Sequence, residues 1–201
     1  TNPASDLELK LPATIGTANQ VVANGSTPGT LEFVENDSRT LLSTTTLSGT
    51  STVVSVDLTG YQHLEGLVYG LVNSSSPNYI QDTFIRVNSL STDIYSYVLH
   101  AMDYNGTGST QAKHTISGIY YNLAGTSGWE NTNNWAAFNF LHVNGGSRKF
   151  FNMNAGGDGH TGGEQVLSAV GYVELTSAIT SIQFACTDTI TAGTLKLYGV
   201  K

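Results

Sequence analysis

The stretch Thr194-Leu195-Lys196-Leu197-Tyr198-Gly199-Val200 decides the fold class, because apolar and polar residues alternate along it. Leu195 and Leu197 fall on one face of a two-residue period, and Lys196 falls on the other. Residues 83–88 alternate in the same way. A segment with one buried and one wet face is typical of a strand in an antiparallel sheet. The pattern therefore predicts an all-β protein.

Strand signals continue from residue 53 to the C-terminus at the spacing of about 8–12 residues that is typical of a β-sandwich. They cover residues 53–58, 63–72, 83–88, 94–104, 114–123, 135–143, 149–154, 165–174, 179–186 and 194–200. Clusters of Gly, Asn, Ser and Pro separate them. We predict a jelly-roll-like β-sandwich of about 8–10 strands over residues 53–201. An immunoglobulin-like sandwich is the alternative.

The composition agrees with strands and limits the partners. Gly, Ser, Thr and Asn make up 84 of the 201 residues, whereas charged residues make up only 11%. This mixture favours strands and turns over helices. A net charge of −7 with scattered basic residues does not suit the binding of nucleic acid or of an anionic membrane. No apolar run approaches the ~20 residues of a membrane-spanning helix. We predict neither a nucleic-acid partner nor membrane insertion.

Residues 1–52 form a separate region with little apolar material. Its apolar strips are Leu7-Glu8-Leu9-Lys10-Leu11 and Leu31-Glu32-Phe33-Val34. Two short strips cannot bury a core alone, so neighbouring chains or the downstream domain must cover them. We predict an extended N-terminal arm that serves in anchoring and oligomerisation. Its predicted contact residues are Leu7, Leu9, Leu11, Leu31 and Phe33.

Aromatic and amide side chains gather around residues 120–134. Ring faces stack on the apolar patches of sugars while amides bind hydroxyl groups, so this mixture suits a glycan-binding surface. The candidate residues are Tyr120, Tyr121, Trp129 and Asn131. The alternative places one or both tryptophans in the core or in a subunit contact. Trp135 opens the predicted strand 135–143, and we expect it to be the structural one.

The glycine-rich segment 156–164 is the weak candidate for a metal site, through Asp158, His160 and Glu164. Its spacing matches no calcium-loop motif, so a hairpin connection with a polar tip is the favoured interpretation. We predict no metal and no cofactor. The sequence has no Gly-X-Ser-X-Gly motif and its five histidines are dispersed, so we predict no enzyme. A glycan hydrolase that uses Asp158 or Glu164 is the third hypothesis.

Segments at both ends resemble a known group of proteins. The N-terminal ones read Lys10-Leu11-Pro12, Ile15-Gly16-Thr17-Ala18-Asn19-Gln20-Val21-Val22 and Gly29-Thr30-Leu31-Glu32-Phe33-Val34. In this order they resemble a segment recurrent in tailed-bacteriophage fibre and other virion proteins, in which Leu and Trp usually stand at positions 22 and 33. Ala178-Ile179-Thr180-Ser181-Ile182-Gln183-Phe184 and residues 191–200 are similar to the closing strands of phage virion jelly-roll domains. Gly60-Tyr61-Gln62-His63-Leu64 resembles the opening of those domains.

The resemblance implies a non-enzymatic phage virion structural protein, usually a homotrimer, with a β-sandwich head on the virion surface. It implies other virion proteins of the capsid or tail as partners. Within this interpretation, a capsid decoration protein and a short fibre that binds host-surface glycans both stay open. The alternative from another class is a carbohydrate-binding module of an extracellular bacterial protein.

Overall fold

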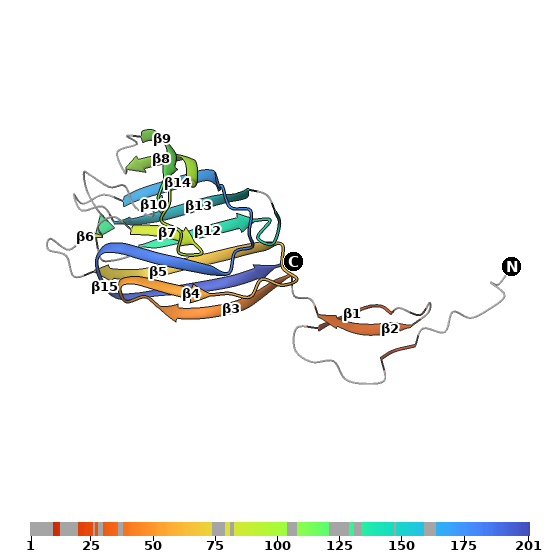
Figure 1. Ribbon diagram of the computed structural model, residues 1–201. Coiled ribbons are helices and arrows are strands. Elements are labelled where there is room, and N and C mark those ends of the chain that lie inside the picture. Colours follow the sequence, from red (N-terminus) through yellow and green to blue (C-terminus); the bar gives the residue numbers. More distant parts are fainter. Residues whose placement is uncertain are drawn as a thin grey trace. The chain divides into compact units, whose positions relative to one another are not determined.

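A computed structural model describes most of the chain (Figure 1). The described residues are 10–12, 20–25, 27, 30–35, 38–73, 79–80, 83–103, 108–120, 129–130, 134–146, 148–158 and 164–201. Every regular element among them is a β-strand, which confirms the prediction of an all-β protein. Within these residues, no helix is long and apolar enough to cross a membrane.

The chain divides into two compact units, Thr1–Ser38 and Arg39–Lys201, which we call the arm and the head. In the arm, β1 (Gln20–Asn24) pairs antiparallel with β2 (Leu31–Glu35). A parallel bridge joins Lys10 to Thr30. The division lies at Ser38 rather than after residue 52, because residues 39–55 pair with strands of the head.

The head contains one strongly curled antiparallel sheet of 11 strands (Figure 1). The strand order is β10-β7-β15-β5-β12-β13-β14-β8-β9, and β3 and β4 also pair with β15. The strands are β3 (Arg39–Thr46), β4 (Gly49–Ser55), β5 (His63–Asn73), β7 (Thr83–Val87), β8 (Tyr95–Asp103), β9 (Gly108–Ile116), β10 (Ile119–Tyr120), β12 (Trp135–Leu141), β13 (Lys149–Asp158), β14 (Glu164–Val173) and β15 (Ser181–Val200). Separately, β6 (Tyr79–Ile80) pairs with β11 (Trp129–Glu130).

The curled sheet has two layers, and strand β15 belongs to both of them. Residues 181–186 pair with β4 and β7, which form the small layer with β10. Residues 194–200 pair with β3 and β5, and the large layer continues from β5 to β9. The buried apolar side chains of both layers form one hydrophobic core. The arrangement is consistent with the predicted jelly-roll-like fold.

A bulge in β15 explains how one strand serves both layers. Even-numbered residues such as Ile182 and Phe184 are buried before the bend, and odd-numbered Leu195 and Leu197 are buried after it. The register with β5 shifts twice, with an extra residue in β15 between Ile190 and Ala192 and an extra residue in β5 between Ala192 and Thr194. One extra residue in a strand reverses which side chains face the core. The sequence analysis predicted two strands here, 179–186 and 194–200, whereas the structure has one strand with an irregularity.

Gly193 occupies the bulge with a φ of 148°. Its carbonyl oxygen accepts a hydrogen bond of 2.9 Å from the Leu47 backbone N–H. A Cβ at this position would lie 2.9 Å from Leu71 Cδ1 and 3.3 Å from the Leu71 Cα. Glycine is therefore required both by the backbone conformation and by the close approach of β5.

We expect Gly193→Ala to lower the free energy of unfolding by about 2 kcal/mol or more, because the new methyl group strains the backbone and contacts Leu71. Urea unfolding followed by circular dichroism measures the change. Gly146→Ala is the matched control, since a Cβ there meets no atom within 4 Å. Equal losses in the two variants would contradict the role of the bulge.

Two tyrosines of β8 tie the layers together. The Tyr95 hydroxyl accepts a hydrogen bond of 3.0 Å from the Val87 backbone N–H and donates one of 3.0 Å to the Leu90 carbonyl. The Tyr97 hydroxyl accepts a hydrogen bond of 3.0 Å from the Tyr120 backbone N–H. Burial raises the pKa of Tyr95 to about 12, and it raises the pKa of Tyr97 as well.

The raised pKa of Tyr95 makes stability depend on pH in alkali. In the unfolded chain a tyrosine ionises near pH 10, so the unfolded state loses its proton first. The stabilisation is complete below about pH 10 and is lost as the pH rises through the folded pKa of about 12. We expect the free energy of unfolding to fall over this window, by about 2–3 kcal/mol for Tyr95. Chemical unfolding between pH 9 and 12 tests it, and an equal slope in Tyr95→Phe would contradict it.

Candidate functional site

The outer face of the large layer, which points away from the core, carries an unusual mixture of side chains. Antiparallel register places residues of neighbouring strands side by side in rows across the sheet. One row consists of Tyr69, Trp135, Gly156, Val166 and Met102, from β5 to β8. The next row consists of Leu67, Ala137, Asn154, Ser168, His100 and Thr110.

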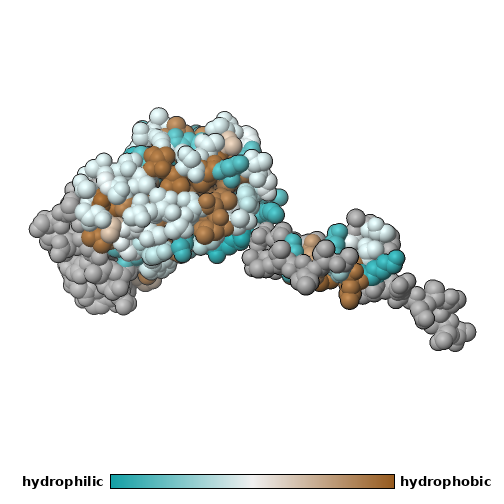
Figure 2. All heavy atoms as spheres, turned by 90° about the horizontal axis from the view of Figure 1, so that it is seen from below, coloured by the Kyte–Doolittle hydropathy of each residue, from teal (hydrophilic) through white to brown (hydrophobic). Residues whose placement is uncertain are grey.

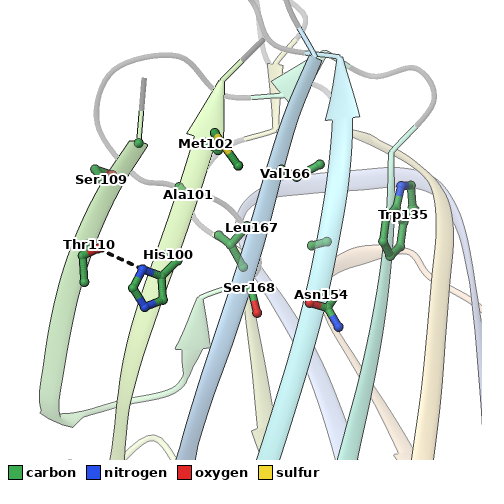
Figure 3. Close-up of a pocket in the computed structure, with 12 residues that line it drawn as sticks. His100, Ala101, Met102, Ser109, Thr110, Trp135, Asn154, Val166, Leu167 and Ser168 are labelled. Atoms are coloured by element: carbon green, nitrogen blue, oxygen red, sulfur yellow. Dashed lines mark hydrogen bonds between the residues drawn. The ribbon is translucent and has the colours of Figure 1, made fainter. Parts of the chain in front are cut away.

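A groove of about 620 Å³ runs over these two rows (Figure 3). Trp135 stands at one side on β12, and His100 and Thr110 stand at the other side on β8 and β9. Asn154 and Ser168 lie between them on β13 and β14. The residues that line the groove therefore come from five strands of the large layer.

Trp135 forms an apolar wall of the groove because 41% of its surface is exposed. Trp135 therefore does not lie in the core, whereas its place in a subunit contact stays a prediction. In β12, Ala136, Phe138 and Phe140 are buried, so the two-residue period turns Trp135 outward together with Asn139. That alternation was visible in the sequence and could have identified the exposed ring.

Asn134 fixes the start of β12 and with it the position of Trp135. Only 2% of Asn134 is exposed. Its Oδ1 accepts a hydrogen bond of 2.8 Å from the Leu71 backbone N–H, and its Nδ2 donates one of 2.8 Å to the Leu71 carbonyl. This paired contact joins β12 to the end of β5 inside the core.

The polar lining of the groove consists of hydroxyl and amide groups and one imidazole. The Thr110 hydroxyl and His100 Nδ1 are 2.9 Å apart and share a hydrogen bond. Asn154, Ser168 and Ser109 supply an amide and two hydroxyl groups. No Asp, Glu, Lys or Arg is among the described residues that line the groove.

A second hollow of about 310 Å³ adjoins the groove, and both contain Asn154. We call it the amide hollow, because Asn139 and Asn152 join Asn154 in its lining. At its far side, Arg39 Nε lies 2.7 Å from Glu65 Oε2. The Arg39 guanidinium also lies 3.8 Å from the centre of the Tyr198 ring.

Asn139 brings an unused hydrogen-bond acceptor to the amide hollow. Its Oδ1 is buried and has no hydrogen-bond partner among the described residues. Buried polar atoms of this kind are rare in folded proteins, because they have lost their bonds to water without replacement. The groove and the amide hollow together can hold an uncharged molecule with one apolar face and several hydroxyl groups.

Of the predicted aromatic cluster, only Tyr120 has a described side chain. Tyr120 is partly buried on β10, with its ring centre 4.7 Å from that of Phe84. Trp129 belongs to β11, and nothing of its side chain is described. Tyr121 and Asn131 lie outside the described residues. The cluster as a glycan-binding site stays a prediction.

The candidate metal ligands fall partly on described backbone. Asp158 and Glu164 are the last paired residues of β13 and β14 and stand opposite each other. The structure describes neither the side chains of these two residues nor any part of His160. Across the described part of the chain, no three His, Cys, Asp or Glu side chains gather to hold a metal ion.

Two of the predicted contact residues of the arm, Leu31 and Phe33, lie on its two-stranded sheet. Leu31 and Phe33 share one face of β2, and Val22 of β1 is the direct partner of Phe33. Half of the Val22 surface is exposed, and Leu11 is 75% exposed. Leu7 and Leu9 lie outside the described residues.

The chain matches no protein-family model, and no curated protein matches its sequence. Two solved structures align with 90% of it, each at 11% identity. One is infectious bursal disease virus, Gt strain, with 47% of that chain covered and a TM-score of 0.12. The other is a mutant VP2 protein of the same virus in derived T=1 particles, with 45% covered and a TM-score of 0.11. The chain spans about half the length of both, and scores this low carry no argument.

We expect Asn134→Ala to lower the free energy of unfolding by about 2–4 kcal/mol, because it leaves the buried Leu71 N–H and carbonyl without these bonds. Urea unfolding provides the measurement. Asn152→Ala is the control, since Asn152 is exposed and we expect a change of at most about 0.5 kcal/mol. A change that small for Asn134→Ala would show that the contact contributes little.

Proposed function

We propose that this chain is a non-enzymatic structural protein of a bacteriophage virion. In this proposal it is a trimer that displays its β-sandwich head on the particle surface, as a capsid decoration protein or a short fibre. The head contacts host-surface glycans, and the arm contacts other chains. The observation that carries the proposal is that the arm has an exposed two-stranded sheet, whereas the head has its own core.

The arm supports the proposal because it lacks a core within its described residues. A two-stranded antiparallel sheet is at best marginally stable in water. The face of Val22, Leu31 and Phe33 is apolar and partly exposed in the single chain. Three copies around a symmetry axis, or a flat surface of another virion protein, would remove this face from water. Such contacts would stabilise the sheet by burying its apolar face, which the arm alone leaves partly exposed.

The head supports the proposal through the segments that resemble phage virion domains. The Tyr61 ring lies so close to Gly199 that a Cβ on Gly199 would fall 2.6 Å from it. The Gln62 N–H donates a hydrogen bond of 2.8 Å to the Val200 carbonyl. The opening segment 60–64 and the closing segment 191–200 therefore meet in one structural unit. The resemblance at the opening and at the close of the head thus corresponds to a single local arrangement.

The surface of the head is mostly neutral. Figure 2 shows one face, on which pale side chains of intermediate hydropathy surround separate brown apolar patches. Serine, threonine and glycine produce such a surface in a chain with only 11% charged residues. A neutral polar exterior is compatible with contact to glycans.

Immunogold labelling of purified particles tests the location. An antibody against the head should label intact virions, and unlabelled particles would exclude the proposal. Particles that lack the chain separate the two positions. Heat-sensitive capsids with normal adsorption indicate decoration, and poor adsorption with intact capsids indicates a fibre.

We expect Val22→Asp to abolish trimer formation, because it places a carboxylate beside Phe33 on the apolar face of the arm. Light scattering should give three times the 21.3 kDa chain mass for the wild type and one chain for the variant. The melting temperature of the head should not change. Glu32→Gln, on the opposite face of β2, is the control and should stay trimeric. A trimeric Val22→Asp protein would contradict the role of the arm.

The groove with Trp135 favours one second candidate, a carbohydrate-binding module of an extracellular bacterial protein. An exposed aromatic ring beside amide and hydroxyl groups suits that function without any virion. A monomer that binds polysaccharide and is absent from particles would favour this candidate.

A further inference from the structure

The outer face of the large layer offers an aromatic platform. Trp135 and Tyr69 are direct partners on neighbouring strands, and each exposes more than a third of its surface. Met102 and Val166 continue the apolar row on the far side of Gly156. An exposed ring of this kind presents a flat apolar surface to a ligand with its own apolar face.

Hydrogen-bonding groups lie directly beside this platform. Asn154 and Ser168 are partners in the adjacent row, and the hydrogen-bonded pair of His100 and Thr110 closes the groove. These side chains include both donors and acceptors. They suit hydroxyl groups, which also donate and accept.

The amide hollow extends the same surface along β12. Asn139 follows Trp135 by four positions, a distance of about 13 Å along a strand. Asn139 Oδ1 is buried without a partner among the described residues, so a ligand hydroxyl can supply its missing hydrogen bond once the amide turns toward the hollow. A linear ligand that covers both hollows would therefore contact rings at one end and amides at the other.

The charged side chains around the two hollows favour a neutral ligand over an anionic one. Among the described residues that line the two hollows, the Lys, Arg, Asp and Glu side chains are Arg39 and Glu65, and these are paired at 2.7 Å. A carboxylate or phosphate bound in the hollows would find no unpaired Lys or Arg among them. Lys196 lies outside this lining, with its Nζ 5.8 Å from the centre of the Tyr69 ring. A neutral ligand needs no such cation.

We propose that this face binds a neutral oligosaccharide, with one sugar ring stacked on Trp135 and a following sugar hydrogen-bonded to Asn154, Asn139 and Asn152. The inference rests on the proposed contact between the head and host glycans. It assigns that contact to the large layer, through Trp135 instead of the predicted residues Tyr120 and Trp129. The ligand class is an uncharged polysaccharide with exposed hydroxyl groups.

The chain has only two tryptophans, which permits a direct test. In full-length Trp129→Phe protein, Trp135 is the single indole. The probes are dextran, mannan, laminarin, xylan and galactan, which are all uncharged. We expect at least one of them to slow the protein in affinity gel electrophoresis. The same polymer should shift Trp135 emission to the blue and protect it from acrylamide, since a stacked sugar removes water from the ring.

Trp135→Ala in the wild-type background should weaken binding to that polymer by roughly tenfold or more, the factor that corresponds to about 1.4 kcal/mol. Asn139→Leu and Asn154→Leu should weaken it as well. Phe150→Ala is the matched control, because Phe150 is a half-exposed ring on the same face that lines neither hollow. Its affinity should match that of the wild type. Thermal unfolding verifies that each variant is folded.

Three results would overturn the inference. One is the absence of binding to every polymer, and the second is an equal loss of affinity in Trp135→Ala and Phe150→Ala. The third is a blue shift of Trp135 that follows protein concentration without sugar, which would assign the face to contact between copies. Labelled virions without sugar binding would remove this inference and leave the proposed place of the chain on the virion. Sugar binding by a chain that is absent from particles would remove that place on the virion and leave the sugar site.

Discussion

The head depends on the backbone hydrogen bonds of β15, because this strand belongs to both layers. Its first part pairs with β4 and β7, and its last part pairs with β3 and β5. The bulge at Gly193 allows the change of layer, since it turns odd-numbered side chains toward the core after even-numbered ones. Because β15 runs through both layers, no additional strand is needed to join them around their shared hydrophobic core. The tyrosine hydroxyls of β8 add contacts to the small layer on the side away from β15.

The large layer of the curled sheet has an outer face that is broad enough for a ligand. Core residues of β12, β13 and β14 hold these strands in register, so their outward side chains form rows with fixed spacing. Trp135 and Asn154 occupy neighbouring rows for this reason alone. A site on paired strands is held more rigidly than one on loops, and its ligand loses less binding energy to ordering of the protein.

Much of this fold could be predicted from the sequence, whereas the site could not. Two-residue alternation identified the strands around Ile85 and Leu197, because burial of one face determines that pattern locally. The sequence pattern predicted one strand that ends at residue 186 and another that begins at residue 194, but Ile190 pairs with β4 and β5 and Ala192 pairs with β5 inside that interval. The groove depends on the register among five strands from distant parts of the chain, which no local pattern specifies. The predicted cluster around Trp129 relied on proximity in sequence, whereas the groove assembles by proximity in space.

The place of β15 in the chain has a consequence for biosynthesis. The ribosome releases residues 39–180 before residues 181–200, so the small layer and the edge of the large layer exist at first without the strand that both of them pair with. Apolar side chains such as Ile85 and Leu64 stay exposed to water during that interval. Most contacts of the head also join residues distant in sequence, which slows folding. The nascent chain must therefore avoid aggregation until its last strand arrives, and chaperones can act in that interval.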